Sequence, residues 1–77
     1  MITDQQLHDN RRQIGQRIAE IRTSKGLRLE DVEQLTGLRF QNLSRIESGM
    51  YSTGIDIYFK ISKALEVNLE ELFKQEV

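Results

Sequence analysis

The stretch TGLRFQNLSRIESG, residues 36–49, decides the fold because a glycine corner in it leads into one short amphipathic helix. Gly37 suits a turn that requires a positive φ angle, which glycine adopts without steric cost. Leu43 and Ile46 recur at helical spacing and mark the inward face of the helix that follows, from about Arg39 to Ser48. The stretch therefore predicts a helix end, a tight turn and a new helix.

The residues before the corner predict a second short helix, from about Leu29 to Thr36, with acidic residues in its first turn. Only two or three residues join the two helices, so we expect them to cross at a steep angle. This is the geometry of a helix-turn-helix, in which the second helix projects from the surface and fits the major groove of DNA. The same glycine is equally compatible with an ordinary helix end in any helical bundle.

The outward face of the third helix carries side chains that suit base pairs. At about 100° per residue, four of them lie opposite the core and two lie on the flanks: Gln41, Ser44, Arg45 and Ser48, then Phe40 and Asn42. Amides can bond adenine edges, arginine can read guanine or hold phosphate, and apolar groups can meet a thymine methyl. These residues favour contact with double-stranded DNA, and a merely polar surface helix is the alternative.

The rest of the chain, which contains no proline, divides into three more predicted helices. The first ends at about Ser24, before Gly26, and residues 1–10 are either frayed or an extension of it. The fourth runs from Ile55 to Leu65, and a last helix carries Leu69, Leu72 and Phe73. The fourth helix is expected to turn five residues inward: Ile55, Tyr58, Ile61, Ser62 and Leu65. We expect an all-α, compact five-helix bundle that makes residues 1–77 a single domain.

Composition excludes several classes of protein. The 77 residues contain no cysteine, which excludes disulfides and thiolate metal sites. A hydrophobic fraction of 38% with 30% charged residues is typical of a soluble globular domain. No apolar run reaches membrane-spanning length and no signal-peptide pattern opens the chain, so a cytoplasmic protein without a membrane segment is expected.

The formal net charge of −1 is not the basic balance that DNA-binding domains usually show, but the charges are unevenly distributed. Six basic residues and one acid lie between positions 11 and 28. We interpret most of them as solvated helix faces, and we take Arg17 and Arg28 as candidates for contacts with DNA phosphates.

Catalysis is not expected from this chain. His8 is the single histidine and lies near the N-terminus. Glu70 and Glu71 are better explained as dipole partners in a first helical turn than as an acid–base pair. No glycine-rich phosphate loop is present, and no cofactor or metal is implied.

The run from Ile18 to Phe73 resembles the Cro and phage-repressor (Xre) helix-turn-helix family. The matching pieces are IAEIRTSKGL, TGL, LSRIESG and KISKALEVNLEELF. The resemblance implies a lambda-repressor-like fold and a sequence-specific regulator of transcription. It also implies a homodimer on a near-palindromic operator, with two reading helices about 34 Å apart. The alternative is a protein-interaction module or an antitoxin that uses the same fold to bind a partner protein.

The resemblance further implies roles for individual positions. Four positions would face bases or adjacent phosphates: Arg39, Phe40, Gln41 and Ser44. Arg45 would touch the DNA backbone or buttress the domain against Glu47. Three more positions would meet phosphates: Arg17, Leu29 and the loop at Tyr51.

Three residues depart from the family pattern. Leu29 stands where a phosphate-binding glutamine is usual, Glu33 replaces a small alanine at the helix crossing, and Arg39 replaces a capping serine. Leu29 and Phe40 then either bracket a thymine methyl or shield each other.

Three apolar residues are candidates for a two-fold dimer patch: Ile57, Phe73 and Val77.

Overall fold

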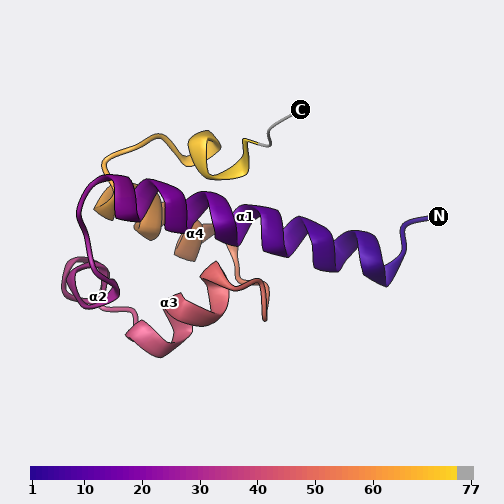
Figure 1. Ribbon diagram of the computed structural model, residues 1–77, viewed down its shortest axis with the longest axis horizontal. Coiled ribbons are helices and arrows are strands. Elements are labelled where there is room, and N and C mark those ends of the chain that lie inside the picture. The colour runs from indigo at the N-terminus through magenta and orange to yellow at the C-terminus, as the bar shows by residue number, and fades with distance from the viewer. Residues whose placement is uncertain (75–77) are drawn as a thin grey trace.

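The computed structural model describes residues 1–74, and every regular element in that range is a helix. Four α-helices come first: α1 (Asp4–Ser24), α2 (Leu29–Thr36), α3 (Phe40–Glu47) and α4 (Ile55–Ala64). A short 3-10 helix, η1 (Leu69–Phe73), follows them. In Figure 1 the long α1 lies across the molecule, with α2 and α3 on one side of it and η1 on the other. The all-α prediction is confirmed.

The expected fifth α-helix is wrong, because the last element is a five-residue 3-10 helix. Its Asn68 cap makes no side-chain hydrogen bond, and the first turn closes by a three-residue bond from the Glu71 N–H to the Asn68 carbonyl, 3.0 Å. Leu72 is completely buried in this short segment. Packing of that side chain, rather than α-helical hydrogen bonding, therefore holds the segment in place.

The first helix starts early and ends as predicted. The Thr3 hydroxyl accepts a hydrogen bond from the Gln6 N–H, 3.1 Å, and the Gln6 side chain accepts one from the Thr3 N–H, 2.9 Å. This capping box makes most of residues 1–10 an extension of α1 rather than a frayed end. At the other end Gly26 has a φ of 71°, and the Leu27 N–H reaches back to the Arg22 carbonyl. No helix within residues 1–74 is both long and apolar enough to cross a membrane.

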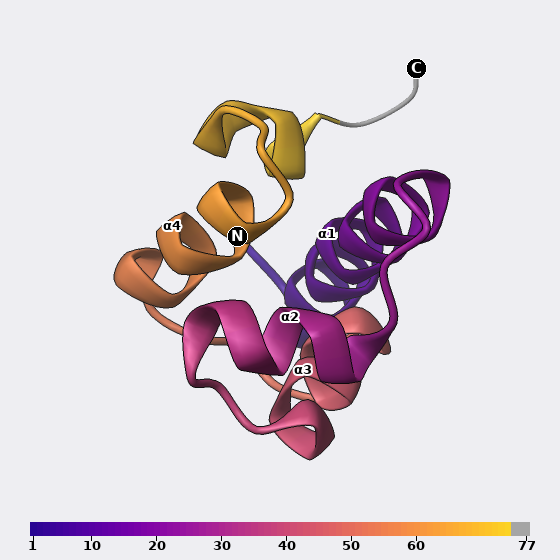
Figure 2. The ribbon, with the colours of Figure 1, turned by 90° about the vertical axis from the view of Figure 1, so that its left-hand side faces the viewer.

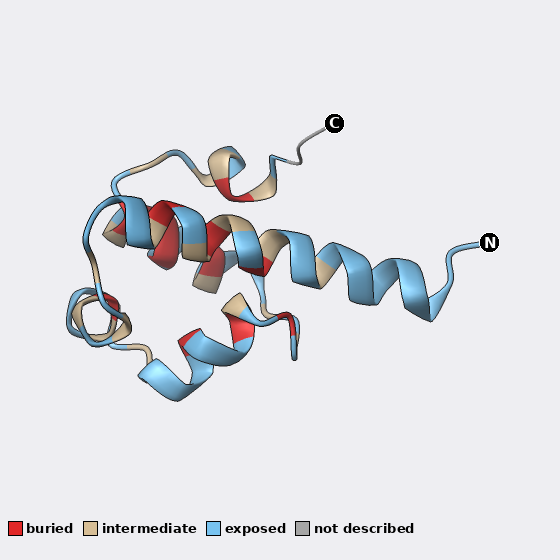
Figure 3. Ribbon diagram, viewed as in Figure 1, coloured by how far each residue is buried: buried red, intermediate tan, exposed pale blue. Residues whose placement is uncertain are grey.

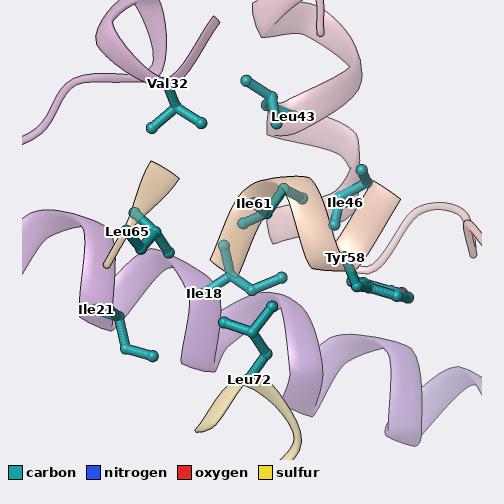
Figure 4. Packing of buried hydrophobic residues seen from close by; sticks show 9 residues of the cluster. All are labelled: Ile18, Ile21, Val32, Leu43, Ile46, Tyr58, Ile61, Leu65 and Leu72. Carbon is teal, nitrogen blue, oxygen red and sulfur yellow. The ribbon is translucent and has the colours of Figure 1, made fainter. Parts of the chain in front are cut away.

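The core is one cluster to which all five helices contribute (Figure 4). Its buried apolar members are Ile18, Ile21, Val32, Leu43, Ile46, Tyr58, Ile61, Leu65 and Leu72. Four of the five inward residues predicted for α4 are buried, whereas Ile55 is 58% exposed. Ile55 opens α4 and lies roughly 60° around the helix from Tyr58, at the edge of the inward stripe.

The candidate dimer residues lie near this core. Ile57 and Phe73 are both half-buried and pack against it. The Phe73 ring meets Tyr58 edge-on, with centroids 5.4 Å apart. Part of the apolar surface that the sequence suggested for a dimer is therefore used within the chain, and Val77 lies outside the described residues.

The backbones of α1 and the C-terminal end of α3 approach each other closely. Gly15 is buried at this crossing, and a Cβ atom there would overlap the backbone carbonyl oxygens of Ile46 and Glu47. Gly49, just after α3, has a φ of 75° and is similarly close to the backbone of Arg12. A side chain at position 15 would push the two helices apart, so only glycine fits.

We predict that Gly15→Ala lowers the free energy of unfolding by about 1–3 kcal/mol, because overpacking outweighs the better helix propensity of alanine. Urea unfolding followed by circular dichroism measures this loss. Gln16→Ala, at the exposed neighbouring position, is the matched control and should change stability by less than about 0.5 kcal/mol. A Gly15→Ala variant as stable as the parent would contradict the close crossing.

Candidate nucleic-acid interface

The turn between α2 and α3 is held by hydrogen bonds at the glycine corner. Gly37 adopts a φ of 78°, and its N–H donates to the Glu33 carbonyl, 2.8 Å. The Thr36 hydroxyl donates to the Val32 carbonyl, 2.7 Å, and accepts from the Leu38 N–H, 3.1 Å. Figure 2 shows that α3 leaves this corner beneath α2 and crosses it. The predicted steep crossing is confirmed.

The N-terminus of α3 is capped by a side chain from α2. Its N-cap residue, Arg39, provides no side-chain hydrogen bond. Instead, the Glu33 carboxylate accepts one from the Phe40 N–H at 3.2 Å. Glu33 stands where the family usually has a small alanine, and its half-buried side chain supplies the acceptor that Arg39 lacks. A negative charge at a helix N-terminus also interacts favourably with the helix dipole.

The C-terminal end of α3 is tied to α1 by an ion pair. Arg22 Nε and Nη2 lie 2.7 and 3.0 Å from the Glu47 carboxylate oxygens, and Nη1 donates to the Leu27 carbonyl at 2.8 Å. The two side chains are only 15% and 12% exposed. The hydrogen-bonded carboxylate raises the pKa of Arg22 above its usual value, which favours the charged pair.

The expected buttress from Arg45 to Glu47 is therefore wrong, since Arg22 is the partner of Glu47. Residues two apart on a helix do not face each other. Arg45 lies on the exposed side of α3, whereas Glu47 is half-buried and bonded to α1.

The outward face of α3 matches the prediction from helical spacing. Leu43 and Ile46 are buried, and the opposite side is exposed (Figure 3). Six predicted site residues come together here: Arg39, Phe40, Gln41, Asn42, Ser44 and Arg45. Within residues 1–74 none of these side chains bonds to another part of the chain. The face thus offers unengaged amide, hydroxyl and guanidinium groups, together with Phe40, a residue that is 39% exposed.

The remaining predicted residues differ in their placement. Arg28 is 75% exposed at the start of α2 and lies 3.3 Å from Asp31, whose pKa is lowered mainly by the backbone N–H of Arg28. Tyr51 and Leu29 are half-buried against the core. Arg17 is not brought to this face, because its guanidinium binds the carbonyl and carboxylate of Glu71 on η1.

Four residues that shape the interface were missed from the sequence: Gly15, Arg22, Glu33 as a cap, and Thr36 as a turn bridge. A glycine inside a helical pattern is a signal of close packing, and Gly15 carries that signal. Arg22 and Glu47 lie 25 positions apart, so no local pattern pairs them.

Comparison with known proteins agrees with this geometry. The helix-turn-helix family HTH_3 matches residues 18–72. The structure of the restriction-modification controller protein C.AhdI from Aeromonas hydrophila is similar, with a TM-score of 0.82 and 32% identity over 84% of this chain and 98% of that one. The structure of an HTH_3 family transcriptional regulator from Vibrio cholerae is also similar, with a TM-score of 0.81 and 33% identity. The match covers 87% of this chain and 38% of that one. No curated protein matches the sequence.

We predict that Glu33→Ala lowers the free energy of unfolding by about 1 kcal/mol, the usual cost of losing a helix cap. Glu33→Gln keeps an oxygen acceptor and should lose less than half as much. Chemical unfolding measures both, and Gln34→Ala at the exposed neighbouring position is the control. Equal losses for the alanine and glutamine variants would show that the acceptor does not matter.

Proposed function

The chain belongs to the helix-turn-helix family HTH_3, and we propose on that premise that it regulates transcription by binding double-stranded DNA through α3. The observation that carries the proposal is the outward face of α3, where amide, hydroxyl and guanidinium groups have no partner within residues 1–74. The similar proteins named above are a controller protein and a transcriptional regulator, which supports the same function.

In this proposal α3 enters the major groove and its exposed face reads sequence. Gln41 bonds a base edge, and Ser44 bonds an adjacent base or phosphate. Arg45 and Arg39 hold the DNA backbone at the two ends of the helix, and Arg28 adds a cation at the start of α2. Arg17 has no role in this arrangement, since Glu71 binds its guanidinium.

Both ends of α3 are anchored to the rest of the domain, which supports its proposed role in binding DNA. Glu33 occupies the Phe40 N–H at the helix start, and the Arg22–Glu47 pair fixes the helix end. A helix fixed at both ends presents its side chains without a large loss of conformational freedom on binding, which favours affinity.

We further propose that two chains bind a near-palindromic operator. Two copies of α3 would then meet successive major grooves about 34 Å apart. A cytoplasmic location fits this role.

We predict that in-vitro selection from random duplexes yields a defined site and that Gln41→Ala changes the preferred base at one or two positions. Arg45→Ala should weaken binding to all sequences about equally and reduce the salt dependence, because a phosphate contact releases counterions without reading bases. Gel shifts at two salt concentrations measure both effects. Binding that is absent, or that does not change with salt, would contradict the DNA-binding proposal.

We also predict that the selected duplex binds two chains cooperatively, because two-fold symmetry places identical helices on the two half-sites. Inserting about half a helical turn, roughly 5 base pairs, between the half-sites should abolish the cooperativity. Sedimentation of the complexes gives the stoichiometry. One chain per duplex, or cooperativity that survives the insertion, would argue for a monomeric binder.

A further inference from the structure

A shallow groove lies between the C-terminal part of α2 and the outer side of α4. The residues that line it are Leu35, Thr36, Phe59, Lys60, Lys63, Ala64 and Glu66. None of them belongs to α3, and none was assigned to DNA. In Figure 2 the left-hand end of α2 approaches α4, whereas α3 lies below them. The groove is therefore a surface separate from the proposed reading face.

The floor of the groove is apolar and open to solvent. Leu35 is 63% exposed and Phe59 is 49% exposed, although both are large hydrophobic residues. Ile55, 58% exposed, precedes Phe59 by four residues and so lies on the same side of α4. Apolar side chains that gather on one exposed face are typical of an interaction surface.

The groove also carries cations that lack acidic partners. Lys63 Nζ lies over the Phe59 ring, 5.2 Å from its centre. Within residues 1–74 neither Lys60 nor Lys63 forms an ion pair, and Glu66 is the one acid that lines the groove. The two charged residues that α4 contributes to the groove, Lys60 and Lys63, are therefore both positive. An occupant with carboxylates beside its apolar side chains would complement this surface.

We propose that this groove binds an acidic amphipathic helix from a partner protein. Apolar side chains at helical spacing on the partner would cover Leu35 and Phe59, and flanking carboxylates would reach the two lysines. An amphipathic helix that lays its apolar face into an apolar groove is a common mode of peptide recognition.

A second copy of this chain fits less well. One acidic apolar segment of the chain, η1, is already engaged, because Leu72 is completely buried and Glu71 binds Arg17 and Lys74. Those groups would have to leave their present partners before they could enter the groove of another molecule.

The test uses the full chain and two synthetic helical peptides of about 18 residues, or five turns. Both carry leucine at helical spacing, with glutamate at every flanking position in one and lysine in the other. Fluorescence anisotropy should show binding of the acidic peptide at least tenfold tighter than that of the basic one. Combined Lys60→Glu and Lys63→Glu replacement should weaken the acidic peptide at least tenfold. Lys25→Glu, an exposed charge reversal at the end of α1, should change its binding by less than twofold.

Other outcomes would overturn the proposal. Equal affinity for the two peptides, no binding of either, or indifference to the double reversal would each do so. If the parent chain sediments as a dimer and the double variant as a monomer, the groove binds a second copy of this chain instead. Circular dichroism and the gel shift on the selected duplex act as controls, because the double variant should fold and bind DNA as the parent does. Loss of DNA binding in this folded variant would place the groove within the DNA surface.

Discussion

The close approach of α1 to the end of α3 is the constraint on which the rest of the structure depends. At Gly15 the two backbones leave no room for a side chain, and the buried core begins about one turn later, at Ile18. The Arg22–Glu47 ion pair links the same two helices, and both of its side chains are largely buried. Together the steric fit and the ion pair determine the direction in which α3 leaves the body of the protein, and hence which of its side chains face outward.

The corner at the other end of α3 shows how one unusual residue compensates for another. Arg39 cannot cap the helix, and Glu33 from α2 provides the missing acceptor across the turn. This solution has a consequence for binding, because a carboxylate now occupies a backbone N–H that would otherwise attract a phosphate. Phosphate contacts near the start of α3 would therefore depend on guanidinium groups, such as those of Arg39 and Arg28.

The internal ion pairs also explain why the net charge says little about function. Arg17 pairs with Glu71 and Arg22 pairs with Glu47, so these four charges offset one another within the chain. Among the charges that reach solvent, the arginines at α3 and the lysines of the α2–α4 groove mark two separate surfaces. The two surfaces differ in chemistry, since α3 carries polar groups that suit base edges, whereas the groove is apolar with cations at its side.

The sequence by itself determined the four α-helices, the C-terminal end of α1, the glycine corner and the inward residues of α3, because these depend on hydrogen bonds and periodicities within a few positions of each other. It also carried enough family pattern to indicate the fold and the reading face. Only the tertiary structure decided that Arg22 pairs with Glu47, that Glu71 holds Arg17 away from α3, and that the last segment is a 3-10 helix. These outcomes involve groups 25 and 54 positions apart, or depend on packing against the completed core. Local spacing carries no information about such contacts, since they arise only when the helices meet.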